Sequence, residues 1–232
     1  MPLILLAITP HHAKAMGLRS FVALPVNRGG VVLRQQFLHN PSTDVSIATT
    51  NAAWGLTGKD TLLFSLPYRI SPSGNNRVSD FSLLYRRILW QADSKYETSR
   101  FALLAGAIQA TDSGRDGATQ LGFVATFYRD RNNLDIDVLY RWGMGSREDD
   151  GRYDVSWQYR MSPTEYPEWG FAPEWFSVIE LNGRWRDGRS IDHQLTLGLQ
   201  WVHDKWVLEG GVIQTLTNNQ DTQYLISTRL HF

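Results

Sequence analysis

The sequence predicts an all-β protein, a single antiparallel transmembrane β-barrel of about 12 strands. Three observations predict this fold class. Apolar and polar residues alternate along most of the chain, as in strands with one apolar and one polar face. Most of the expected strands run 10 to 12 residues, the length that a tilted strand needs to cross a bilayer, whereas strands of soluble sandwiches are shorter. The chain also ends on an alternating strand, residues 224–232, whose last residue is the aromatic Phe232.

Composition narrows the protein class without fixing it. The 232 residues carry 23 basic and 23 acidic side chains, so the formal net charge is zero and nothing indicates a nucleic-acid partner. There is no Cys, which excludes disulfides, thiolate metal sites and a cysteine nucleophile. No run of about 18 apolar residues predicts a transmembrane helix, but a spanning β-strand evades that test because half of it is polar. The nine Trp, nine Tyr and ten Phe suit the aromatic girdles of a barrel.

The first residues form a segment of their own. Residues 3–8 are a short apolar run, and residues 13–15 (Ala-Lys-Ala) resemble a cleavage site, but the positively charged start of a signal peptide is missing. We expect residues 1–15 to be a signal-peptide remnant and residues 16–232 to form the barrel. The alternative is an N-terminal segment that stays in the mature protein.

From residue 30 onward, strands and turns follow one another. Alternation is cleanest in residues 134–142, 153–161, 62–70, 195–201 and 224–232, whereas residues 45–56 and 99–110 do not separate into two faces and leave their register open. The other strands are expected from their length and from the turn signals around them. The expected strands lie near residues 30–39, 45–56, 60–70, 79–91, 99–110, 119–129, 133–143, 152–162, 175–186, 193–203, 205–216 and 222–232.

The connections alternate in length, as they do between the two rims of an outer-membrane barrel. Those at residues 58–59, 131–133 and 204–205 are tight, and those at 71–78, 111–118, 144–151 and 186–192 are longer and polar. The connection at 163–174 is an exception, because it is long and aromatic yet falls on the rim of short turns. Either it folds under the barrel mouth, or the strand count is off by two.

One hairpin carries a family resemblance. Residues 54–68 (WGLTGKDTLLFSLPY) resemble the W/Y-G-L-T-x-x-x-x-L-x-x-x-L-P-Y hairpin of the outer-membrane transporter family named for the meta-pathway of phenol degradation. Residues 79–86 resemble its next strand, with Ser79 where Gly is usual and a shorter spacing before Tyr85. The resemblance is loose beyond residue 86. It implies a barrel of about a dozen strands in the outer membrane and passive uptake of small hydrophobic or aromatic compounds.

If the apolar faces look outward, a set of charged residues lines the lumen. Such a wall could set the selectivity of a pore. Alternatively, the near balance of Arg and carboxylates favours a paired network that fills a narrow or partly plugged lumen. The predicted lumen-lining residues are Arg34, Arg69, Arg86, Asp135, Asp137, Arg141, Asp154, Arg160, Glu180, Arg184, Glu209 and Arg229.

Aromatic residues and histidines are the other candidate site residues. Most Trp residues are expected in interfacial belts, but Trp169 and Trp175, in and just after the unusual connection, are candidates for a gate or a ligand contact. The six His show no metal-ligand spacing, so we predict no metal and no cofactor. No G-x-S-x-G motif is present, and we predict that the protein is not an enzyme.

The function that these patterns favour is an outer-membrane channel for passive uptake of small hydrophobic or aromatic molecules in a Gram-negative bacterium. The expected partners are outer-membrane lipid, a small-molecule solute and the barrel assembly machinery, which would engage Phe232. The alternatives are a plugged structural or ligand-binding barrel without conductance, a membrane lipid hydrolase, and a soluble β-sandwich or lipocalin-like carrier.

Overall fold

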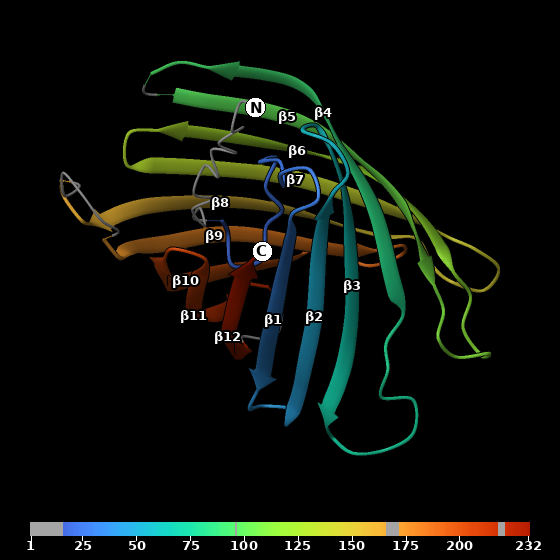
Figure 1. Ribbon diagram of the computed structural model, residues 1–232. Helices are drawn as coiled ribbons and strands as arrows, with labels where there is room; N and C mark the ends of the chain where they lie inside the picture. Colours follow the sequence, from blue (N-terminus) through green and yellow to red (C-terminus); the bar gives the residue numbers. More distant parts are fainter. Residues whose placement is uncertain (1–15, 96, 166–171, 218–220) are drawn as a thin grey trace, which may run out of the picture.

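The computed structural model describes residues 16–95, 97–165, 172–217 and 221–232, and it is a closed antiparallel barrel (Figure 1). The strands follow one another around the ring in chain order, and β1 closes it by pairing with β12. The prediction of an all-β barrel with 12 strands is confirmed. The strands are β1 (Val31–Asn40), β2 (Val45–Gly55), β3 (Asp60–Ser71), β4 (Phe81–Asp93), β5 (Glu97–Gln109), β6 (Ala118–Arg129), β7 (Asn132–Gly143), β8 (Asp150–Ser162), β9 (Glu174–Arg186), β10 (Asp192–His203), β11 (Trp206–Thr215) and β12 (Thr222–His231).

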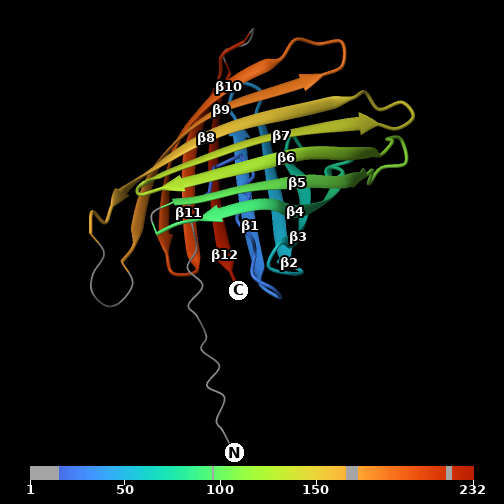
Figure 2. The same ribbon diagram turned by 90° about the horizontal axis from the view of Figure 1, so that it is seen from above.

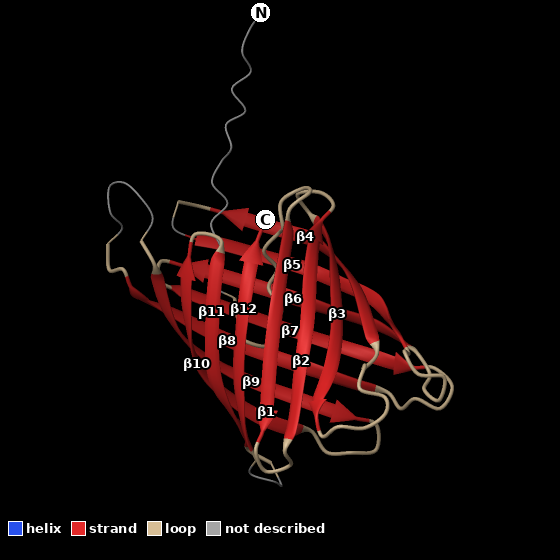
Figure 3. Cartoon of the chain, turned by 60° about the horizontal axis from the view of Figure 1, so that its bottom comes forward, coloured by secondary structure: helices blue, strands red, loops and turns tan. Residues whose placement is uncertain are grey.

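The strands are tilted, and their connections differ between the two ends of the barrel (Figure 3). What we call the loop end carries the connections at 41–44, 72–80, 110–117, 144–149, 187–191 and 216–221. The turn end carries those at 56–59, 94–96, 130–131, 163–173 and 204–205, together with the start of β1 and the end of β12. β8 ends and β9 begins at the turn end, so the strand count is not off by two. In the long connection between them, residues 166–171 lie outside the described residues. No helix in the described part of the chain is long and apolar enough to cross a membrane.

The two faces of the barrel wall have opposite polarity. On β7, Asp135 and Asp137 point into the barrel and are fully buried, whereas Trp142 on the other face is 44 % exposed. On β12, Ile226 is 65 % exposed and Arg229 is 1 % exposed. Large apolar side chains therefore cover the outside and charged ones lie within, which is the arrangement of a barrel in lipid rather than of a soluble carrier.

The structure explains why the sequences of β2 and β5 show no clear alternation of apolar and polar residues. On β5, the inward residues Ala102 and Leu104 are fully buried in an apolar cluster, while Leu103 on the outer face is 38 % exposed. Both faces of β5 are therefore apolar. On β2, small and weakly polar residues occupy both faces, so polarity does not distinguish them either.

The facing of β7 makes a testable prediction about stability. Val138 lies at mid-strand on the outer face, so Val138→Arg places a charge near the bilayer midplane and should lower the free energy of unfolding by roughly 2–4 kcal/mol. Asn132→Arg, on the same face but at the turn end, should cost about 0–1 kcal/mol. Urea titration of the two variants in lipid vesicles measures both values, and equal costs would contradict the membrane placement.

Candidate functional site

The segment before β1 lies inside the barrel. Residues 16–27, which we call the lumen segment, have no helix or strand and occupy the interior of the ring of strands (Figures 1 and 2). Leu18 and Ala23 are fully buried, and Val22 is 3 % exposed. A stretch without regular secondary structure has backbone N–H and C=O groups that must find partners in the lumen.

Acceptors on the wall bind alternate N–H groups of this segment. The Phe21 N–H donates to Asp137 Oδ2 at 2.7 Å, and the Ala23 N–H donates to Thr126 Oγ1 at 2.9 Å. The Arg19 N–H donates to Glu180 Oε2 at 3.1 Å. These acceptors come from β7, β6 and β9, so three strands hold one face of the lumen segment.

Cationic and amide side chains hold its carbonyl groups. Arg34 Nη2 donates to the Leu18 carbonyl at 2.5 Å, and Gln36 Nε2 donates to the same oxygen at 3.2 Å. The guanidinium of Arg86 donates to the Val22 carbonyl. These donors come from β1 and β4, so the segment is fixed between opposite parts of the wall.

Apolar contacts complete the fit of the lumen segment. Leu18 packs over Gly198 and Gly211, which are paired on β10 and β11, and a Cβ atom at either glycine would collide with Leu18 Cδ1. Ala23 joins a buried apolar cluster that includes Leu104 of β5 and Val124 of β6. The inward apolar residues of β5 therefore face the segment rather than water.

Two ion networks lie in the wall around the segment. Glu209 pairs with Arg34 at 2.5 Å and with Arg229 at 2.8 Å. Asp154 pairs with Arg184 at 2.8 Å and with Arg152 at 3.3 Å. Such shared pairing lowers the cost of burying each charge.

All twelve predicted lumen residues lie on the inward-facing positions of their strands, but they do not form one group. Arg34, Glu209 and Arg229 meet in one network, and Asp137, Asp154 and Arg184 lie around Arg152 in the other. Apart from these, Arg69 donates to the Asn75 carbonyl at the loop end at 3.0 Å, Arg141 pairs with Asp150, and Asp135 accepts a hydrogen bond from Thr126. Arg160 lies near the turn end of β8.

Sequence reasoning missed Arg152 and the lumen segment. Arg152 pairs with Asp137 and Asp154, and its guanidinium carbon lies 4.2 Å from the ring centroid of Phe21. Extending the inward alternation of β8 by one step toward its start would have found Arg152. Residues 16–27 carry no periodic signal of this kind.

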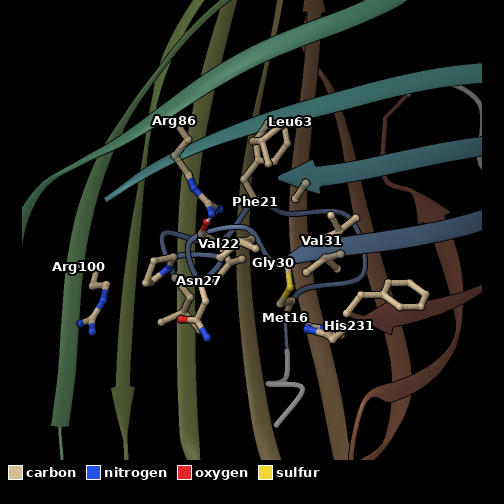
Figure 4. A pocket seen from close by; sticks show the side chains of 16 residues that line it. Met16, Phe21, Val22, Asn27, Gly30, Val31, Leu63, Arg86, Arg100 and His231 are labelled. Carbon is tan, nitrogen blue, oxygen red and sulfur yellow. Dashed lines mark hydrogen bonds between the residues drawn. The ribbon is translucent and has the colours of Figure 1, made fainter. Parts of the chain in front are cut away.

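Among the described residues, one cavity lies on either side of the lumen segment, which lines both. The loop-end cavity has a volume of about 550 Å³, and the turn-end cavity, shown in Figure 4, has about 400 Å³. The two cavities share five lining residues, and we call this shared boundary the junction. It consists of Met16, Phe21, Val32, Ala53 and Leu63, all of which are apolar.

The two aromatic candidates are not found in the lumen. Trp175 is 44 % exposed on the outer face at the start of β9, in a turn-end belt with Trp54, Trp157 and Trp206. This placement removes it as a gate, because it faces away from the interior, and its exposure suits a membrane interface. Trp169 lies outside the described residues.

A Ser–His pair lies on the outer face, where the hydrolase alternative needs one. Ser46 Oγ and His39 Nδ1 are 2.9 Å apart on the paired strands β2 and β1. In the described chain no carboxylate or amide is hydrogen-bonded to His39, so the pair lacks the third group that orients a catalytic histidine. The described residues also contain no group of three or more His, Asp or Glu placed to hold a metal ion.

Known structures share this architecture. A KdgM porin is 8 % identical with a TM-score of 0.58, and the alignment covers 88 % of this chain and 99 % of that one. The COG4313 outer membrane channel from Pseudomonas putida F1 is 12 % identical with a TM-score of 0.54, over 90 % of this chain and 98 % of that one. The chain has the fold of an outer-membrane β-barrel. At these identities the likeness establishes the fold alone. No protein-family model and no curated protein matches the sequence.

The barrel also has a hydrogen-bonded contact between two connections at the loop end, formed by Asp116 and Ser146, which we call the loop clasp. Asp116 accepts hydrogen bonds from Ser146 N and Ser146 Oγ, both at 2.8 Å. Arg147 beside it pairs with Asp80 at 2.8 Å. The two bonds from Ser146 stabilise the charged carboxylate and lower the pKa of Asp116.

The lumen segment makes a prediction at Gly17. A Cβ atom there would collide with Ser20 Oγ, Glu180 Oε1 and Ser156 Oγ, so Gly17→Val should displace the segment from its wall partners. Amide hydrogen exchange at Phe21 and Ala23 should then speed up, because their N–H groups lose Asp137 and Thr126. Gly58→Ala is the matched control, since nothing lies within 4 Å of a Cβ there. Unchanged exchange in Gly17→Val would contradict the described attachment.

The loop clasp makes a prediction about pH. Because the pKa of Asp116 is depressed in the folded protein, the stability that the clasp contributes is present above the unfolded value of about 3.9. It is lost as pH falls through the lower, folded value. An NMR titration of the Asp116 carboxyl carbon should give a pKa below 3.9, and Ser146→Ala should move it part of the way back. A titration at the ordinary aspartate value would show that the clasp does not form.

Proposed function

We propose that the protein is a passive outer-membrane channel for small molecules with an apolar or aromatic body. The pair of cavities on either side of the junction supports this proposal, because the interior is hollow toward both ends. The barrier between them includes Met16 and Phe21 of the lumen segment, which is held by hydrogen bonds and side-chain packing rather than by strand pairing.

The chemistry of the junction supports the solute class. A sugar, or a hydrated ion without an apolar body, would shed water there without gaining a hydrogen bond, which is costly. An apolar solute would lose little, because its contacts with Phe21 and Leu63 replace contacts with water. Val22, Leu24 and Val31 extend this apolar surface into the turn-end cavity.

A sealed structural or ligand-binding barrel is the second candidate. The hydrogen bonds from Phe21 to Asp137 and from Ala23 to Thr126, together with the contact of Arg86, favour it, because a firmly held segment would close the lumen. The cavities would then be binding sites and not parts of a path.

Liposome swelling separates the two candidates. Vesicles with the folded protein should swell faster in phenyl glucoside than in a disaccharide, since the aromatic ring tolerates the apolar junction. Gly17→Val should admit both solutes, and Gly58→Ala should behave as the wild type. Wild-type vesicles that exclude both solutes, while Gly17→Val admits them, would favour the sealed barrel. Exclusion by both proteins would count against any channel.

A further inference from the structure

The charges that line the cavities are mostly of one sign. The loop-end cavity is lined by seven arginines and a single carboxylate, that of Asp80. The turn-end cavity is lined by Arg86 and Arg100, and no carboxylate side chain of the described residues lines it. The near balance of charge in the whole sequence therefore does not hold at the surface of the cavities.

This asymmetry arises from how the ion pairs are oriented in the loop-end half. The side chains of Glu209, Asp137 and Asp154 have no exposed surface. Two arginine side chains that pair with them keep some exposed surface, 13 % for Arg34 and 15 % for Arg152. Arg229, the other partner of Glu209, is 1 % exposed. The arginines line the cavity and these three carboxylates do not, so a solute in the cavity contacts positive charge. A hollow with low-dielectric walls strengthens that field.

The environment of Arg86 gives the strongest evidence for an anion site. Arg86 is 3 % exposed, it lines the turn-end cavity, and it forms no ion pair with any carboxylate of the described residues. Its two terminal nitrogens donate to the Val22 carbonyl and to Thr61 Oγ1, and its Nε has no hydrogen-bond partner. Figure 4 shows its guanidinium reaching toward Val22 in the cavity.

A buried cation without a counter-ion is costly to keep. The lumen segment offsets this cost only with a neutral carbonyl. An anion that enters the turn-end cavity would supply the missing charge, and the hydrogen bonds that it accepts would be charge-assisted.

Positively charged groups therefore lie on both sides of the apolar junction. Arg34 and Arg152 line the loop-end cavity, and Arg86 lines the turn-end cavity. We propose that the channel selects small organic anions, in which a carboxylate is joined to an apolar or aromatic body. The carboxylate passes from the loop-end arginines to Arg86 while the body crosses between Phe21 and Leu63. This inference rests on the proposed channel function and names its substrate class.

Reversal potentials across a planar bilayer test the selectivity. The full-length protein is measured in gradients of sodium benzoate, sodium chloride and benzylammonium chloride. Benzoate should permeate better than sodium, better than chloride and better than benzylammonium, which carries the same ring and the opposite charge. Equal permeation of benzoate and benzylammonium would overturn the proposal, and so would equal permeation of benzoate and chloride.

Arg86 provides the matched variants. Arg86→Gln removes the charge without leaving a carboxylate unpaired, so the preference for benzoate over sodium should fall toward one, whereas Arg86→Lys should keep it. Arg129→Gln is the control, since that side chain is 74 % exposed on the outer face at the turn end and should change nothing. An unaltered preference in Arg86→Gln would contradict the role of Arg86.

A variant at a second position tests the proposal independently, in case the Arg86 variants do not fold. Arg141 lines the loop-end cavity with 30 % of its side chain exposed, and Arg141→Gln should also reduce the benzoate preference. A protein that carries no current in any gradient would refute the channel itself. A protein that conducts without preferring benzoate would refute only the anion inference.

Discussion

The structure depends on the mutual satisfaction of the lumen segment and the charged wall. An irregular stretch of backbone cannot be buried unless its N–H and C=O groups find partners, and ionised side chains cannot be buried unless they are hydrogen-bonded or paired. In this barrel the charged side chains of the wall are the hydrogen-bond partners of the backbone of the lumen segment, so each satisfies the other. Asp137 and Glu180 accept from the N–H groups of the segment, and Arg34 and Arg86 donate to its carbonyls. Removing either side would leave the other with unsatisfied groups.

This constraint explains why the interior is neither an open pore nor an apolar core. The wall keeps most of its charges because they are paired in the ion networks around Glu209 and Asp154 or hydrogen-bonded to the lumen segment. The segment fills the middle of the lumen and leaves hollows toward both ends. The apolar junction and the cationic linings are then consequences of where the segment crosses and of which side chains it leaves uncovered. The proposed selectivity combines these two features.

The sequence predicted the strands of the barrel wall, but it did not predict the segment that fills the lumen. Alternation on strands such as β7 and β12 is a local signal that depends only on the two faces of a strand, so the barrel, its twelve strands and the inward arginines and carboxylates could be read from it. β5 gave no such signal, because its inward residues Ala102 and Leu104 pack against other apolar groups instead of water. That failure was itself a sign that something covers the inner wall there.

The lumen segment could not be predicted because its contacts are distant in sequence. Residues 16–27 meet partners on β1, β4, β6, β7, β9 and β10, and no spacing within the segment encodes them. For the same reason, the division of the arginines between paired and unpaired positions was hidden. Arg34 and Arg86 both occupy inward positions in the alternation, but only Arg34 pairs with a carboxylate, that of Glu209 on β11.

The most direct test of this account uses the absence of cysteine from the chain. Ala23 N lies 2.9 Å from Thr126 Oγ1, so cysteines placed at positions 23 and 126 should form a disulfide on mild oxidation of the folded barrel in vesicles. A shift in gel migration that reductant reverses is the predicted result. Failure to form the bond, together with free labelling of the cysteine at position 23 by a reagent too large to enter the barrel, would show that the segment lies outside the lumen and would contradict the account.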